Sequence, residues 1–197
     1  MINIFTNHGN FGFAPDLFIK SSVIIPIFLI IAIGHTVRLV RGKSTLPRIV
    51  LVWTFYIYLY TVASITQFPI SWFNESNPLH RYSFGQQYMV TLNPISWINN
   101  SKFQIIGNVL LLVPLTLIGG LIFPRIRTFL RSAIIAFGFS LGIELVQLIM
   151  SYFYLGNRVF DVGDLLLNTT GGLIGYGLLV LLTKAFSQDS IARILKV

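Results

Sequence analysis

Five apolar stretches constrain the fold of this chain more than any other feature of its sequence. They cover residues 21–40, 46–68, 104–123, 129–152 and 164–183, and each is rich in Ile, Leu, Val and Phe. A helix of about 20 apolar residues crosses the ~30 Å hydrocarbon core of a bilayer. Charged residues make up 10% of the chain, whereas a soluble domain carries about 25%. We therefore predict an all-α polytopic membrane protein with about five transmembrane helices, forming a single membrane domain over residues 1–197.

The basic residues lie in clusters between the apolar stretches. The first turn contains Arg38, Arg41, Lys43 and Arg48, the third contains Arg125, Arg127 and Arg131, and the tail contains Lys184, Arg193 and Lys196. Cytoplasmic loops of membrane proteins carry an excess of Lys and Arg. The pattern therefore predicts a cytoplasmic C-terminus and an N-terminus outside, with the long loop 69–103 outside as well.

These clusters also decide how the formal net charge of +8 is interpreted. In a soluble protein such a charge suggests binding to nucleic acid, but here the clustered basic residues indicate the orientation of the spans in the membrane. We expect a multi-pass protein of the cell membrane whose partner is the lipid bilayer, with no nucleic acid partner. A sixth, amphipathic helix over residues 2–20, docked on the membrane surface, is an alternative that the pattern leaves open. The chain has no cysteine, which excludes disulfides and thiolate metal sites.

Two polar stripes interrupt the apolar stretches. On the fourth stretch the stripe consists of Ser140, Glu144, Gln147 and Ser151, spaced by 4, 3 and 4 residues and so on one helix face. The last stretch begins with a stripe of the same rhythm, formed by Asp161, Asp164, Asn168, Gly171 and Gly175. The pairs Gly171/Gly175 and Gly138/Gly142 are small-xxx-small patterns, which predict the close approach of another helix.

The two stripes reach a similar depth. If the fourth helix enters the membrane at Phe129, Glu144 lies about 22 Å along it at 1.5 Å per residue, in the outer third of the bilayer. Asn168 lies about one turn inside the outer end of the last helix. Asn108 and Gln104 add polar groups near the outer start of the third helix. The sequence therefore predicts a polar pocket that opens to the outer leaflet.

Burial of charge sharpens this prediction. A carboxylate at mid-membrane costs roughly 2.5–3.5 kcal/mol, so Glu144 must be neutral, paired or hydrated. Arg158 is its expected partner, or that of Asp161. Three acids against one arginine leave surplus negative charge, which predicts a proton, a cation or a cationic part of a ligand in the site. The structural alternative is that such stripes only hold helices together, for which Asn108 and Gln147 are good candidates.

The candidate site residues divide into two groups. The candidates for catalysis are Glu144, Arg158, Asp161 and Asp164. The candidates for binding are Asn108, Ser140, Gln147 and Asn168. Whether a metal ion or another cofactor binds is left open by the sequence.

Four segments carry a resemblance to a known family. They are LNPISWI at Leu92–Ile98, GNVLLLVP at Gly107–Pro114, SLGIELVQ at Ser140–Gln147 and RVFDVGDLLLNTTGGLIG at Arg158–Gly175. In order, spacing and chemistry they resemble the VanZ-like family of bacterial membrane proteins, over a core of residues 92–183. Members of this family are associated with resistance to teicoplanin and related glycopeptide antibiotics. The resemblance implies a role in antibiotic resistance or in the cell envelope, and it supplies no reaction.

We therefore expect a membrane protein that contributes to lipoglycopeptide resistance through a pocket at the outer leaflet. Its ligand would be the lipoglycopeptide or an envelope lipid. One alternative is a metal-dependent enzyme acting on an envelope lipid or on the drug, since carboxylates suit Mg²⁺ or Ca²⁺. Another is a non-catalytic partner of an envelope-synthesis complex that docks through the loop 69–103.

Overall fold

Five helices in the described part of the chain are long and apolar enough to cross a membrane, as expected. The computed structural model describes residues 1–6, 9–99 and 101–186. The candidate spans are Ser21–Arg41, Leu46–Gln67, Lys102–Ile122, Phe129–Tyr152 and Val162–Ala185. The first consists of a short 3-10 turn, η1 (Ser21–Ile24), and helix α1 (Ile25–Arg41), and the second is α2 (Leu46–Gln67). The chain is therefore a multi-pass membrane protein by the length and composition of its helices.

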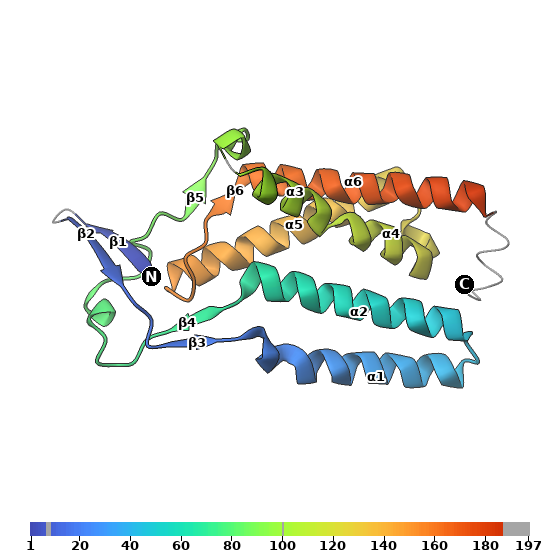
Figure 1. Cartoon of the computed structure of the whole chain (residues 1–197), viewed down its shortest axis with the longest axis horizontal. Helices are drawn as coiled ribbons and strands as arrows, with labels where there is room; N and C mark the ends of the chain where they lie inside the picture. The colour runs from blue at the N-terminus through green and yellow to red at the C-terminus, as the bar shows by residue number, and fades with distance from the viewer. Residues whose placement is uncertain (7–8, 100, 187–197) are drawn as a thin grey trace.

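Helix α6 (Val162–Ala185) organises the C-terminal part of the bundle. It packs against α3 (Lys102–Leu111), α4 (Val113–Ile122) and α5 (Phe129–Tyr152). Figure 1 shows α1 and α2 as an antiparallel pair beside this group, and α2 joins the two parts through contacts with α4 and α5. A buried apolar cluster of Val62, Leu111, Leu112, Leu115 and Ile143 fills the junction.

The third span is broken at Leu112, where the sequence predicts one continuous helix over residues 104–123. The cause is Pro114, which lacks an N–H to donate and whose ring clashes with the carbonyl of the preceding turn. The carbonyl of Leu111 is satisfied by the hydroxyl of Tyr58, which donates to it at 2.9 Å. Such repair is needed because lipid offers no hydrogen-bond donors to a freed carbonyl.

The glycines of α6 let it approach this break closely, as the small-xxx-small pattern predicts. A Cβ added at Gly171 would lie 1.8 Å from the carbonyl oxygen of Val109, and one at Gly175 would lie 2.1 Å from that of Val113. The hydroxyl of Thr116 donates to the carbonyl of Gly172 at 2.6 Å. The backbone of α6 therefore lies directly against the backbone of the broken span.

A small extramembrane cap contains strands, so the expectation of an all-α protein is wrong in this part. Its strands form three two-stranded sheets: β1 (Ile2–Thr6) with β2 (Gly9–Phe13), β3 (Leu17–Ile19) with β4 (Ile70–Trp72), and β5 (Val90–Thr91) with β6 (Phe160–Asp161). The alternative of an amphipathic helix over residues 2–20 is also wrong. Alternating Ile2 and Ile4 are fully buried, in a cluster with Leu79 and Tyr154, because they point to one face of β1.

The basic turns lie together at the end of the bundle opposite to the cap. Figure 1 places the α1–α2 turn, the α4–α5 connection and the end of α6 at this same end. The α4–α5 connection includes the short turn η4 (Pro124–Ile126). Two residues of the predicted basic tail, Arg193 and Lys196, lie outside the described residues. The charge asymmetry on which the predicted orientation depends is therefore present between the two ends of the described bundle.

The contact between α6 and the broken span makes a testable prediction. Gly171→Ala should destabilise the protein by about 1–3 kcal/mol or more, because its Cβ would overlap a backbone carbonyl that cannot move freely. Gly177→Ala, on the same helix with nothing within 4 Å of the added Cβ, is the matched control and should leave stability near wild type. Thermal unfolding of the two variants in detergent measures the difference, and equal melting temperatures would contradict the close packing.

Candidate functional site

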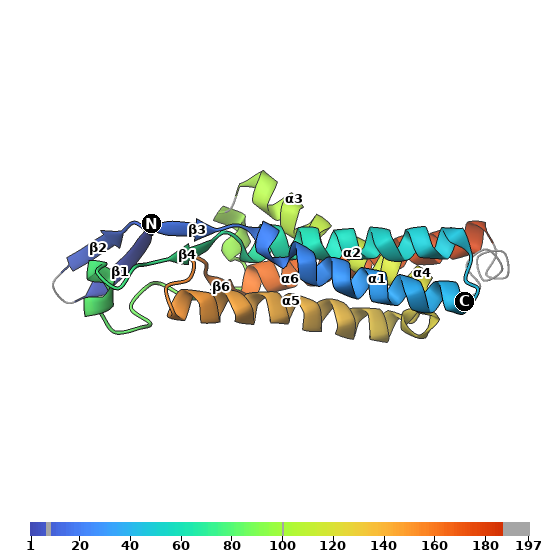
Figure 2. The same cartoon turned by 90° about the horizontal axis from the view of Figure 1, so that it is seen from below.

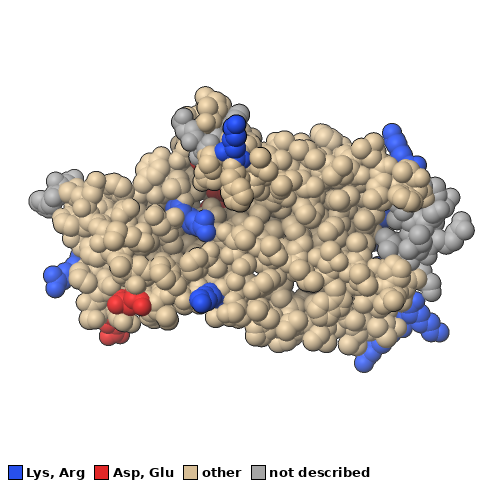
Figure 3. Space-filling view, in the orientation of Figure 1, with Lys and Arg blue, Asp and Glu red and all other residues tan. Residues whose placement is uncertain are grey.

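A polar cavity of about 600 Å³ lies among the ends of α2, α3, α5 and α6 that are nearest to the cap. Its polar lining comes from all four helices, from β5 and from the segment before α6, and comprises Thr66, Thr91, Gln104, Asn108, Glu144, Gln147, Asn157, Arg158, Asp161, Asp164 and Asn168. In Figure 3 acidic atoms are visible at the bottom of a hollow in the surface. Seven of the eight sequence-predicted site residues thus line one cavity, from elements far apart in the chain.

Glu144 joins the two stripes at this cavity. Only 2% of its surface is exposed, and its carboxylate accepts a hydrogen bond of 2.9 Å from the backbone N–H of Asp161. The stripe of α5 and the stripe that begins α6 therefore face each other, as predicted. A backbone N–H stabilises a carboxylate without supplying a positive charge, so this bond fixes the position of Glu144 but provides no counter-charge.

Asp161 begins helix α6 and ties it to the cap. Its Oδ1 accepts from the N–H of Gly163 at 2.7 Å, which is an N-cap bond. The same oxygen accepts from the hydroxyl of Ser96 at 2.6 Å. Thr91 of β5 pairs with Asp161 in β6. These contacts hold the loop 90–99 against the first turn of α6.

Asp164 and Asn168 continue the stripe into the membrane. Oδ1 of Asp164 accepts from the side-chain amide of Asn108 at 2.5 Å, which connects α6 to α3. Asn168 is 2% exposed, and its Oδ1 is buried with no hydrogen-bond partner among the described residues. A buried acceptor without a donor costs about 1–3 kcal/mol, so Asn168 marks a place where a donor is missing.

Two further candidates have structural bonds. The amide of Gln147 donates to the carbonyl of Thr66 at 3.0 Å, linking α5 to α2. The hydroxyl of Ser140 is fully buried and donates to the carbonyl of Leu165 at 3.3 Å. Ser140 is not among the cavity-lining residues, so the geometry gives it a helix-packing contact rather than a place in the pocket.

The expected ion pair of Arg158 is absent from the described residues. Its guanidinium instead donates to two backbone carbonyls at the end of α2, those of Ile65 and Phe68, at 3.4 Å each. The backbone of Arg158 is held by Ser151, whose hydroxyl accepts from the Arg158 N–H at 3.1 Å and donates to the Arg158 carbonyl. Arg158 lies in the loop before α6, and this loop turns its side chain toward α2. The predicted pairing with Asp161 assumed that both residues lie on one helix, three positions apart.

Sequence reasoning missed the contributions of the cap and of α2. Ser96 bonds Asp161 although 65 residues separate them, and Thr66 reaches the cavity from a helix that has no polar stripe. Single serines and threonines are common, and neither residue had a spacing that singled it out. Only the β5–β6 pairing and the packing of α2 on α5 bring them to the site.

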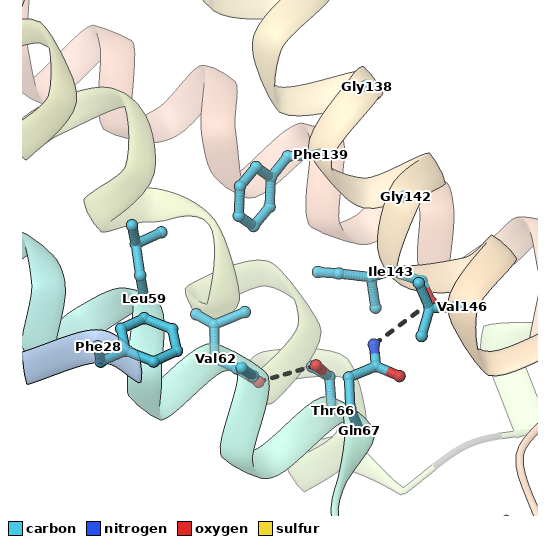
Figure 4. Close-up of a pocket in the computed structure, with 11 residues that line it drawn as sticks. Phe28, Leu59, Val62, Thr66, Gln67, Gly138, Phe139, Gly142, Ile143 and Val146 are labelled. Atoms are coloured by element: carbon cyan, nitrogen blue, oxygen red, sulfur yellow. Dashed lines mark hydrogen bonds between the residues drawn. The ribbon is translucent and has the colours of Figure 1, made fainter. Parts of the chain in front are cut away.

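An apolar groove of about 470 Å³ lies on the other side of the α2–α5 contact. Figure 4 shows Leu59 and Val62 of α2 on one wall and Gly138, Phe139 and Gly142 of α5 on the other. An added Cβ at Gly138 or Gly142 would meet nothing within 4 Å. The prediction that this glycine pair packs against another helix is therefore wrong, since the glycines instead leave open space between α2 and α5.

Metal binding gains no support from the described geometry. Within residues 1–6, 9–99 and 101–186, no group of three or more His, Cys, Asp or Glu side chains is arranged to hold a metal ion. The carboxylates of Asp161 and Asp164 engage Ser96 and Asn108 instead. The arrangement is a set of separated acceptors around an open cavity.

Comparison with known proteins supports the resemblance drawn from the four sequence segments. The profile of the family described as VanZ/LLP1 matches residues 55–183, which span from the middle of α2 to the end of α6. No curated protein and no solved structure matches the chain.

The bond between Asn108 and Asp164 predicts energetic coupling between α3 and α6. In a double-mutant cycle, Asn108→Ala and Asp164→Ala should be non-additive by about 1 kcal/mol or more, because the hydrogen bond is charge-assisted. The control pair is Asn108→Ala with Thr170→Ala, since Thr170 is exposed and bonds only within α6. Unfolding in detergent measures each variant. Additivity in both pairs would mean that the Asn108–Asp164 bond contributes nothing.

Proposed function

The chain belongs to the VanZ/LLP1 family, a membership that links this membrane protein to glycopeptide resistance, and on that premise we propose that it acts in resistance to teicoplanin-type lipoglycopeptides through the polar cavity. One observation supports this proposal most. Three of the four segments that carry the family pattern place side chains in the same cavity: Asn108 from Gly107–Pro114, Glu144 and Gln147 from Ser140–Gln147, and Arg158, Asp161, Asp164 and Asn168 from Arg158–Gly175. Residues needed only for helix packing would be expected at contacts between helices rather than around one open cavity.

The proposed mechanism is binding of an amphiphile at the outer leaflet rather than a chemical reaction. The cavity is lined by Ile65 and Thr66 of α2 and by Phe103, Gln104 and Gly107 of α3. The last three residues are exposed on the membrane-facing side of α3. Figures 1 and 2 show the start of α3 beside α6, at the edge of the bundle. A ligand with an apolar tail would therefore enter sideways between α2 and α3 while its polar end reaches the acids.

The side chains have distinct roles in this proposal. Glu144 and Asp164 are the acceptors for the polar end of the ligand, and Asp161 fixes the start of α6. Arg158 positions the loop before α6 on the end of α2, because its guanidinium bonds backbone carbonyls there. This role replaces the orientation of the acids by Arg158 that the sequence suggests.

The orientation in the membrane is part of the proposal. The cap and the cavity would face outward and the basic end would face the cytoplasm, following the excess of Lys and Arg in the turns. The whole chain would form one membrane domain, 1–197, with the family core in residues 92–183. A lipoglycopeptide acts on the outer surface of the membrane, so this orientation gives it access to the cavity.

A docking role of the loop 69–103 remains a second candidate because the loop is unusually apolar on its surface. The exposed fractions are 72% for Leu92, 56% for Ile95 and 59% for Ile98. Exposed apolar patches mark contacts with proteins or with membranes.

Replacing these three side chains with serine should abolish copurification of an envelope-synthesis complex if the loop docks it. Protection by such a variant without copurification would support the cavity.

The cavity proposal predicts the effect of one isosteric change. Glu144→Gln should abolish protection against a teicoplanin-type drug, because it removes the buried negative charge while keeping the size of the side chain. Its abundance in the membrane should stay near that of wild type. Thr170→Val, an isosteric change on the exposed face of α6, is the control and should protect fully. Minimum inhibitory concentrations, with immunoblots of membranes, measure both quantities. Full protection by Glu144→Gln would refute the proposal.

A further inference from the structure

The cavity contains hydrogen-bond acceptors in excess of donors. Oδ1 of Asn168 is buried and has no partner among the described residues. In the hydrogen bonds of the described part of the chain, each cavity carboxylate uses one oxygen: Oε2 of Glu144, Oδ1 of Asp161 and Oδ1 of Asp164. The three acids therefore line space that the protein does not fill, and Asn168 lines the same space with a buried Oδ1 that no donor satisfies.

The charged side chains of the cavity also favour a ligand that donates hydrogen bonds. Three carboxylates line the cavity, and the guanidinium of Arg158 is engaged by the carbonyls of Ile65 and Phe68. Acids that lose contact with bulk water are stabilised by a nearby positive charge. A group that is both a cation and a donor of several hydrogen bonds therefore fits this lining.

The lining decides which kind of cation fits. Quaternary ammonium groups are recognised by the faces of several aromatic rings, and among the described residues Phe103 alone gives this lining an aromatic ring. The described residues offer no arrangement of three His, Cys, Asp or Glu side chains for a metal ion. A primary ammonium group carries one positive charge and three N–H donors, which matches separated oxygen acceptors.

We propose that the cavity binds the primary ammonium group of an amphiphile that enters between α2 and α3 from the membrane. This inference rests on the proposed function in using the same cavity, and it adds the chemical class of the ligand. The ammonium group donates to Oδ1 of Asn168 and to the carboxylates of Glu144 and Asp164. The apolar part stays at the open side, next to Phe103, which is 87% exposed. The amine belongs either to an envelope aminolipid or to the drug.

Competition between matched lipids tests the ammonium group. The full-length protein is mixed with equal amounts of phosphatidylethanolamine and phosphatidylcholine of identical acyl chains, and bound lipid is counted by native mass spectrometry. The two headgroups carry the same net charge, but only the first has N–H donors. We expect about a tenfold preference for phosphatidylethanolamine, the ratio that corresponds to a single charge-assisted hydrogen bond. N-acetylation of that lipid should remove the preference. Equal binding of the two lipids by the wild type would overturn the inference.

Variants locate the preference in the cavity. Asn168→Leu and Glu144→Gln should each bring the ratio of the two lipids close to one. Thr170→Val should keep the tenfold ratio, since Thr170 lies on the same helix as Asn168 but outside the cavity lining. If Asn168→Leu does not fold, the isosteric Glu144→Gln carries the test alone. A ratio that Glu144→Gln leaves unchanged would place the ammonium group elsewhere and overturn the inference.

Competition with the drug identifies the source of the amine and separates this inference from the proposed function. Displacement of the aminolipid by a lipoglycopeptide, but not by its N-acetylated form, would assign the site to the drug. No displacement would assign it to the lipid, and both results uphold an ammonium site. Loss of protection in Glu144→Gln without any lipid or drug preference would overturn the inference and leave the proposed function standing. A cavity-dependent preference for the ammonium group, together with full protection by Glu144→Gln, would uphold this inference and overturn the proposed function.

Discussion

The absence of water around a membrane-spanning backbone is the constraint on which the rest of this structure depends. Pro114 breaks the third span at Leu112 and frees backbone carbonyls in a region where lipid cannot satisfy them. The hydroxyl of Tyr58 bonds one of them. The glycines of α6 allow its backbone to lie against Val109 and Val113. Repair of one broken helix thereby fixes the position of α6 relative to α3 and α4.

That position determines which helices the N-terminal half of α6 faces. Because Gly171 and Gly175 hold the inner half close to the broken span, the same helix face carries Asp164 and Asn168 toward α3 and α5. At the end of α6 nearest to the cap, polar side chains take the place of these glycines, and Asp164 accepts a hydrogen bond from Asn108 of α3. The cavity follows from a single helix face that is small at one end and polar at the other.

The cap lies at the same end of the bundle as this cavity and is tied to it by hydrogen bonds. Hydrogen bonds from Ser71 to the Leu155 carbonyl and from Phe160 to the Met89 carbonyl tie the cap to the loop before α6. Ser96 and β5 reach Asp161 itself. A change of the cap, for example on contact with a ligand or partner, would therefore act directly on the first turn of α6. A cap of small strands suits this role because paired backbones position residues more rigidly than an isolated loop of 35 residues.

The sequence by itself determined the number of spans, the charge asymmetry and the polar faces of α5 and α6. Each of these depends on local hydrophobicity or on the 3.6-residue period, which neighbours in the chain specify. Tertiary structure alone decided that Gly171 and Gly175 contact a helix whereas Gly138 and Gly142 border a groove, although both pairs have the same spacing. It also decided that Arg158 bonds α2 and that Ser96 reaches Asp161. These contacts join residues that are distant in the chain, and a helical period carries no information about which other element lies opposite a given face.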